Sequence, residues 1–210
     1  MSDYYNFHIK RMEKTLNLIP NKYIINNVLN IGYSDFDYYL KEYFKNSSIT
    51  YLIPENTYIE NINKKNYILG NICDPKFNVE NKYNLVIFTE VLEHLLQDNE
   101  IILLNLKKLV AKNGLLLMSV PNGLQLSNRI KVVLGNNIYW SKKEIVNGVY
   151  GGFGHIREYS LNEIRDLVSN YFKIIEIKGI NGYRKGAKKI LNMLPITYCN
   201  TIAVLGENYE

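Results

Sequence analysis

The stretch Asn84-Leu85-Val86-Ile87-Phe88-Thr89-Glu90-Val91-Leu92-Glu93-His94-Leu95 decides the fold, because it joins an apolar run to a cluster of ionisable side chains. Leu85 to Phe88 show no polar alternation, which is typical of a strand covered on both faces of a parallel sheet. Beyond this strand, Glu90, Glu93 and His94 are spaced i, i+3 and i+4, so a helix there would put all three on one face. Open α/β sheets bind ligands at such a place, outside the carboxyl ends of their strands.

Strand and helix patterns alternate on both sides of this central strand. The pattern before it predicts a helix at 3–19, strands at 28–31, 49–53 and 67–72, and a helix at 35–44. The pattern after it predicts a helix that is capped by Asp98 and ends at Asn113-Gly114, followed by a strand at 115–120. A capping box of Ser160 and Glu163 predicts a helix that runs to about 171. Two further strands are expected at 172–180 and 198–205, with a short helix at 188–193 between them. The apolar residues expected to face inward from the helix after Asp98 are Ile101, Ile102, Leu104, Leu106, Leu109 and Val110.

This order predicts an α/β fold with a doubly wound, mostly parallel seven-stranded sheet, whose closing pair can be antiparallel. The 210 residues suit a single domain over 1–210, with an N-terminal helix within 1–22. Regular alternation lapses over 122–159, where the only Trp and a glycine-rich run at 148–154 occur. Loops of this length inside a compact domain are usually lids or substrate-binding elements, so we expect a lid insertion there.

Composition narrows the classes of partner. The net charge of +5 permits an anionic substrate but is well below that of a dedicated nucleic-acid binder. The chain has no apolar run of membrane-spanning length and no charged-then-apolar leader, so we expect no membrane partner. Only Cys73 and Cys199 are present, which fits a reducing compartment. We expect a cytoplasmic protein that acts on a small molecule.

The motifs resemble those of class I S-adenosylmethionine-dependent methyltransferases, whose Rossmann-like fold has seven strands. The resemblance covers about residues 24–206 and rests on Val28-Leu29-Asn30-Ile31-Gly32, Gly70-Asn71-Ile72, Thr89-Glu90-Val91-Leu92-Glu93-His94-Leu95, 114–122 and Gly154-His155-Ile156-Arg157-Glu158-Tyr159-Ser160. The Glu-Val-Leu-Glu-His and His-x-Arg-x-Tyr-Ser strings together are similar to the branch that methylates small molecules, sugars or polysaccharide intermediates.

The resemblance implies S-adenosyl-L-methionine as the cofactor. The residues it assigns to cofactor binding are Asn30, Gly32, Tyr33, Ser34, Glu55, Asn71, Ile72, Thr89 and Glu90. The chain departs from the family at the first turn, where an acidic residue and three alternate glycines are usual but Asn30, Gly32, Ser34 and Phe36 stand. The side chains of Ser34 and Phe36 narrow the space for the cofactor, because glycine at these positions would have no Cβ.

Three interpretations of these residues are open. His155, His94 and Glu93 are the candidate catalytic residues, with His155 as general base because imidazole titrates near neutrality. In the second interpretation, a divalent metal ion is bound by Glu90, Glu93, His94 and His155 and lowers the pKa of an acceptor hydroxyl. In the third, the residues are structural: Glu93 and His94 brace the helix, and His155 anchors a loop.

The expected function is S-adenosylmethionine-dependent methyl transfer, with O-methylation of a small polar or sugar-like acceptor. The alternative is a catalytically silent methyltransferase-like partner or regulatory protein, which the altered first turn favours. A nicotinamide-dependent enzyme is disfavoured because no full Gly-x-Gly-x-x-Gly follows the first strand. The sequence leaves the acceptor atom and the oligomeric state open.

Overall fold

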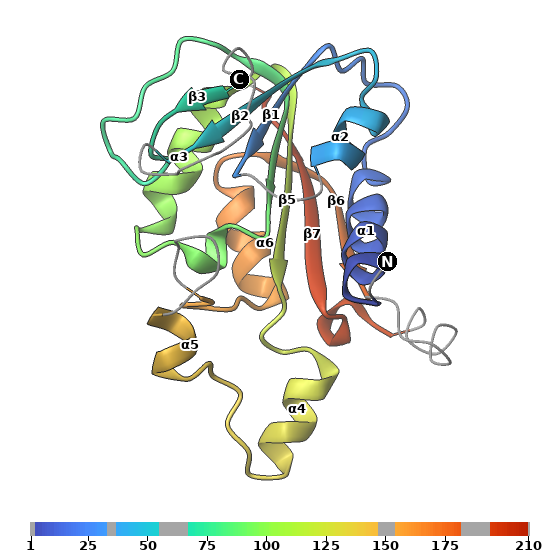
Figure 1. Ribbon diagram of the computed structural model, residues 1–210, viewed down its shortest axis with the longest axis vertical. Helices are drawn as coiled ribbons and strands as arrows, with labels where there is room; N and C mark the ends of the chain where they lie inside the picture. The colour runs from blue at the N-terminus through green and yellow to red at the C-terminus, as the bar shows by residue number, and fades with distance from the viewer. Residues whose placement is uncertain (1–2, 33–36, 55–66, 147–153, 182–193, 210) are drawn as a thin grey trace.

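The chain is known from a computed structural model that describes residues 3–32, 37–54, 67–146, 154–181 and 194–209. Among these residues, seven strands form one sheet in the order β3-β2-β1-β4-β5-β7-β6 (Figure 1). The strands are β1 (Asn27–Ile31), β2 (Ser48–Ile53), β3 (Tyr67–Leu69), β4 (Tyr83–Thr89), β5 (Val110–Pro121), β6 (Lys173–Ile180) and β7 (Thr201–Glu207). The first five pair in parallel, whereas β7 is antiparallel to both of its neighbours. The predicted α/β fold class is confirmed.

The helices are α1 (Asp3–Leu16), α2 (Asp37–Tyr43), α3 (Asn99–Leu109), α4 (Leu126–Val133), α5 (Lys142–Val146) and α6 (Leu161–Ser169), with short 3-10 turns at Leu92–His94 and Ile196–Tyr198. Two apolar cores lie on opposite faces of the sheet. One packs β4 residues Val86 and Phe88 with α3 and α6. The other packs Leu85 and Ile87 with residues of α1 and α2. The central strand is therefore covered on both faces, as its uniform apolar run predicts.

The boundary between α3 and β5 differs from the prediction. Asp98 caps α3 by accepting from the Glu100 backbone N–H, as expected, but the helix ends at Leu109 and the strand begins at once with Val110. Asn113, with φ of 59°, and Gly114 lie inside the strand, at an irregularity in its pairing with β4. A Cβ at Gly114 would come within 2.9 Å of the Tyr83 carbonyl oxygen, so glycine permits this close pairing.

Several smaller expectations also change. The inward face of α3 carries Leu103, whereas Leu104 is exposed. The third strand stops at Leu69, before Asn71 and Ile72.

The expected capping box of Ser160 and Glu163 is present. The helix predicted at 188–193 lies outside the described residues. Within the described ranges, no helix combines the length and apolar character that crossing a bilayer requires.

Candidate functional site

The chain leaves β4 in a tight turn. Glu90 adopts a left-handed conformation with φ of 56°, and only Leu92–His94 form a 3-10 turn. The expected helix carrying Glu90, Glu93 and His94 on one face is therefore wrong, because a left-handed residue ends the regular backbone before the turn begins. The Glu90 N–H still donates to the Ser119 carbonyl at 2.9 Å, which ties the turn to β5.

Glu90 is held by two partners from distant parts of the chain. Arg11 of α1 donates from a guanidinium N–H to Glu90 Oε2 at 2.7 Å, and the Ser119 hydroxyl donates to Oε1 at 2.7 Å. The Arg11 and Glu90 side chains are both mostly buried, so solvent screens their attraction less than at the surface. The carboxylate of Glu90 is thus engaged in binding α1 to the end of β4.

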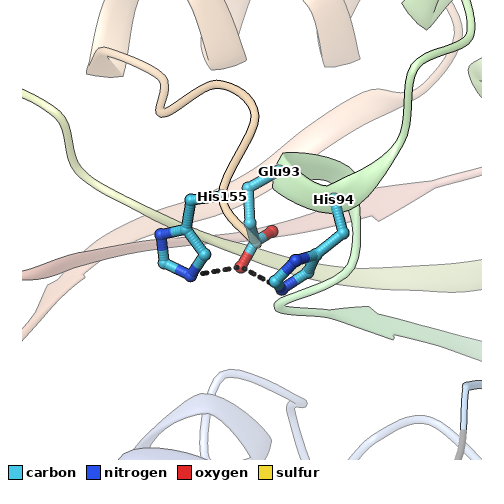
Figure 2. A group of neighbouring side chains, drawn as sticks. All are labelled: Glu93, His94 and His155. Atoms are coloured by element: carbon cyan, nitrogen blue, oxygen red, sulfur yellow. Dashed lines mark ion pairs between the residues drawn. The ribbon is translucent and has the colours of Figure 1, made fainter. Parts of the chain in front are cut away.

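Glu93, His94 and His155 form the centre of the site (Figure 2). Glu93 Oε1 lies 3.8 Å from His94 Nε2 and 4.0 Å from His155 Nε2. The imidazole rings meet edge to face with centroids 5.0 Å apart. Ligand atoms of the three residues all lie within 4.8 Å of one another. Glu90, the fourth residue expected to bind metal, is not in this group.

The Glu93 carboxyl group is buried without a hydrogen bond. Its side chain is fully buried, and neither oxygen has a hydrogen-bond partner among the described residues. Burial, followed by repulsion from Glu90, raises the pKa of Glu93 well above its ordinary value of 4.5. A buried acid that has a raised pKa and makes no hydrogen bond to the described residues is typical of a functional site, since buried polar groups with a purely structural role are nearly always hydrogen-bonded.

His155 is brought to Glu93 by the backbone of its own loop. The Ile156 N–H donates to the Glu93 carbonyl at 2.8 Å, which fixes the loop against the turn after β4. His155 Nδ1 lies 3.1 Å from Glu158 Oε1, and the Trp140 ring stacks on the imidazole at 4.3 Å between centroids. A carboxylate only accepts hydrogen bonds, so the Nδ1 atom carries the proton and Nε2 points toward Glu93 and His94 (Figure 2).

Of the residues expected to bind cofactor, those that the structure describes lie at or near the carboxyl ends of β1, β3 and β4. Gly32 follows β1 with φ of 93°, a conformation that a side chain would strain, and Asn30 donates to the Gly32 carbonyl at 3.1 Å. Asn71 Oδ1 accepts from the Cys73 N–H in a local turn beside buried Ile72. Thr89 ends β4. The other three, Tyr33, Ser34 and Glu55, lie outside the described residues.

Three residues of the site were not found from the sequence. Arg11 pairs with a residue 79 positions away, and Trp140 and Glu158 contact His155 from the insertion and from its own loop. The i, i+3 spacing of His155 and Glu158 was a usable signal, whereas nothing local marks Arg11 or Trp140. Arg157, two residues beyond His155, donates to the Glu163 carboxylate.

The sequence matches no family model and no curated protein sequence. Solved structures do match. The N-methyltransferase NodS from Bradyrhizobium japonicum, in complex with S-adenosyl-L-homocysteine, shares 14% identity over 97% of this chain and 88% of its own, with a TM-score of 0.59. A possible histamine N-methyltransferase from Thermotoga maritima shares 15% identity over 98% of this chain and 91% of its own, with a TM-score of 0.63.

A putative methyltransferase bound to its activator Trm112 from Haloferax volcanii is also similar, with 13% identity, coverage of 99% of this chain and 92% of that chain, and a TM-score of 0.62. Structural similarity at such low sequence identity establishes the fold but does not identify the substrate. The strand order, the antiparallel β7 and these likenesses together show that the chain has the Rossmann-like fold of S-adenosylmethionine-dependent methyltransferases.

Proposed function

We propose that this protein is an S-adenosylmethionine-dependent methyltransferase that methylates a hydroxyl group of a small polar or sugar-like acceptor. The observation that carries the proposal is the Glu93, His94 and His155 cluster, which lies just beyond the carboxyl end of β4. In open α/β sheets this edge binds ligands. The cluster also contains a buried acid that makes no hydrogen bond to any described residue, so its oxygens are available to a ligand.

The chain offers a suitable place for the cofactor. Gly32 has a backbone conformation that favours glycine, and Asn30, Asn71 and Thr89 supply polar groups near the carboxyl ends of β1, β3 and β4. These features fit a nucleoside ligand, with Tyr33, Ser34, Glu55, Ile72 and Glu90 as further contributors from the sequence pattern. When bound, S-adenosylmethionine supplies a methyl group activated by its sulfonium.

His155 is the proposed general base. Glu158 holds the Nδ1 proton, so the Nε2 lone pair accepts the proton of the acceptor hydroxyl as its oxygen bonds to the methyl carbon and the carbon–sulfur bond breaks. His94 and Glu93 line the same space and orient the acceptor by hydrogen bonds. Positioning of this kind provides most of the acceleration of a methyl transfer, because the methyl group is already activated.

The same three side chains also fit a divalent metal ion. Two imidazole nitrogens and one carboxylate are a common ligand set for such ions. Their separations of 3.8 and 4.0 Å exceed the roughly 3.3 Å expected between ligands about 2.0–2.1 Å from zinc, so a small side-chain shift would complete the site. A metal held there would lower the pKa of the acceptor hydroxyl.

A methyl-transfer assay tests the proposal. Purified protein and S-adenosylmethionine labelled in the methyl group are incubated with a panel of sugars, phenols and amines, with and without a chelator. We expect transfer to a hydroxyl acceptor, its loss in His155→Asn, and normal transfer in the exposed control Lys45→Gln. Loss of transfer on chelation and recovery with a divalent ion would assign the metal role to the cluster.

Amines belong in the panel because two of the similar structures are described as N-methyltransferases. Transfer to amines alone would overturn the hydroxyl assignment. Binding of the cofactor without transfer to any acceptor would favour the catalytically silent alternative.

A further inference from the structure

Exposed apolar side chains concentrate in one part of the molecule, residues 124–146, which we term the apolar tip. Eight of the fourteen large apolar side chains that are exposed in the described structure lie there. They include Ile130, Val132, Val133, Leu134, Tyr139 and Trp140. In Figure 1, α4 and α5 extend beyond the carboxyl end of β5, away from the helices that cover the sheet. Concentrations of this kind mark interaction surfaces.

Helix α4 is attached to the body by polar contacts, with its apolar side outward. Asn128 is its only buried residue and donates to the Gly123 carbonyl at 3.0 Å. Arg129 donates to the Leu124 carbonyl at 2.7 Å and lies over the Tyr198 ring. In contrast, Val133 is 85% exposed and Leu134 is 69% exposed. An amphipathic helix normally buries its apolar face, so this inversion indicates a partner for that face.

The charge of the apolar tip defines the kind of partner. It contains four basic residues, Arg129, Lys131, Lys142 and Lys143, and a single acidic residue, Glu144. Glu144 is also engaged locally, since it accepts from the Ser141 N–H at 2.8 Å. Apolar side chains, a neighbouring Tyr and Trp, and flanking lysines are the composition of segments that lie in a membrane interface. Tyrosine and tryptophan favour that position because their rings have one apolar and one polar end.

We propose that the apolar tip docks peripherally onto an anionic phospholipid surface. A second copy of this chain is the less suitable partner, because a two-fold contact through the tip would bring two positively charged surfaces together. The expectation of no membrane partner rested on the absence of a spanning segment, and peripheral docking needs none. Val133 and Leu134 would enter the interface while the lysines contact lipid phosphates.

Docking would bring the candidate site close to the bilayer. Trp140 belongs to the apolar tip and stacks on His155 of the cluster, so the two surfaces are continuous. This placement suits an acceptor held at the membrane surface, an extension that rests on the proposed function. Membrane docking itself does not depend on methyl transfer, so the two can fail separately.

Vesicle binding tests the proposal on the full chain without cofactor or acceptor. Vesicles of equal parts phosphatidylcholine and phosphatidylglycerol are sedimented with the protein, and vesicles of pure phosphatidylcholine serve for comparison. Trp140 is the only tryptophan, so its emission reports directly on the tip. We expect co-sedimentation with the anionic vesicles, a blue shift of the emission, and weakening of both by salt.

Paired variants locate the contact. Val133→Glu with Leu134→Glu should weaken vesicle binding by about tenfold or more, because two apolar groups are lost from the interface. Ile24→Glu, at a site 80% exposed before β1, is the matched control and should bind as the wild type does. The proposal is overturned if anionic vesicles bind no protein, if Ile24→Glu weakens binding equally, or if the tip instead forms a dimer that the double variant dissociates in sedimentation equilibrium.

Discussion

Leu85–Phe88 and Glu90–His94 are separated in the chain only by Thr89 but differ in backbone conformation and in polarity. The four strand residues are wholly buried, apolar and regular. Glu90–His94 contain a left-handed glutamate and a buried carboxyl group that makes no hydrogen bond to any described residue. Natural proteins depart from local regularity mainly at functional sites. The strand therefore provides stability, whereas Glu90–His94 hold groups in arrangements that stability alone does not favour.

Truncating the strand should have the largest effect. Phe88→Ala removes a fully buried ring and should lower the free energy of unfolding by about 3–5 kcal/mol, measured by urea denaturation. Leu104→Ala on the exposed side of α3 should cost less than about 1 kcal/mol. If Phe88→Ala lowered the free energy of unfolding as little as Leu104→Ala does, the strand would not be the source of stability described above.

Glu93→Gln should have opposite effects on activity and stability. We expect methyl transfer to fall about 100-fold or more, because the carboxyl group that lies between the imidazoles is lost. Since burial raises the pKa of Glu93 in the folded protein, the wild type loses stability as the pH rises from the ordinary carboxyl range toward that raised value.

The glutamine variant lacks this titration, so its free energy of unfolding should exceed that of the wild type increasingly as the pH rises. Denaturation curves at several pH values measure the difference. A variant less stable than the wild type across the whole range would mean that Glu93 is a structural residue.

Arg11→Gln tests how the segment Glu90–His94 is held in place. The change leaves Glu90 without its cation, which should cost about 1–3 kcal/mol of unfolding free energy because the pair is mostly buried. Removing Arg11 should also raise the pKa of Glu93 further, since the guanidinium lowers it. Lys45→Gln, in an exposed pair with Glu42, should change stability by less than about 0.5 kcal/mol. Equal effects of the two variants would contradict a special role for Arg11.

His8 on α1 should give the smallest effect. Burial, with a smaller contribution from Arg11, lowers the pKa of His8 from 6.5 to about 4. The folded state therefore loses stability as the pH falls from 6.5 toward 4, because the unfolded chain binds the proton more readily. His8→Gln should reduce this acid loss by about 1 kcal/mol, allowing for solvent screening of a half-buried group. Identical acid denaturation curves for the variant and the wild type would refute this.

The sequence predicted those parts of the fold that depend on local pattern. The uniform run of Leu85–Phe88 was sufficient for the central strand, and the capping box at Ser160 for the start of α6. The resemblance grouped His94 and His155 in one candidate site, and their ring centroids lie 5.0 Å apart. The inward face predicted for α3 was wrong at Leu104, because the four consecutive apolar residues from Ile101 to Leu104 fit more than one face.

The remainder depends on interactions that no local pattern encodes. Glu90 has a left-handed backbone, and its side chain contacts Arg11 and Ser119, which are distant in sequence. The direct transition from α3 to β5 depends on close backbone pairing at Gly114, although an Asn-Gly pair usually marks the end of a helix. Trp140 reaches His155 from an insertion whose path has no periodic signal.

The most direct test of the account is a calorimetric titration of S-adenosyl-L-homocysteine into the wild type, Glu93→Gln and Gly32→Val. The account separates a cofactor site at the β1 turn from a reaction site beyond β4. It predicts micromolar binding to the wild type and to Glu93→Gln, and loss of binding in Gly32→Val, where a side chain would oppose the left-handed turn. No heat with the wild type, or equal binding by Gly32→Val, would contradict it.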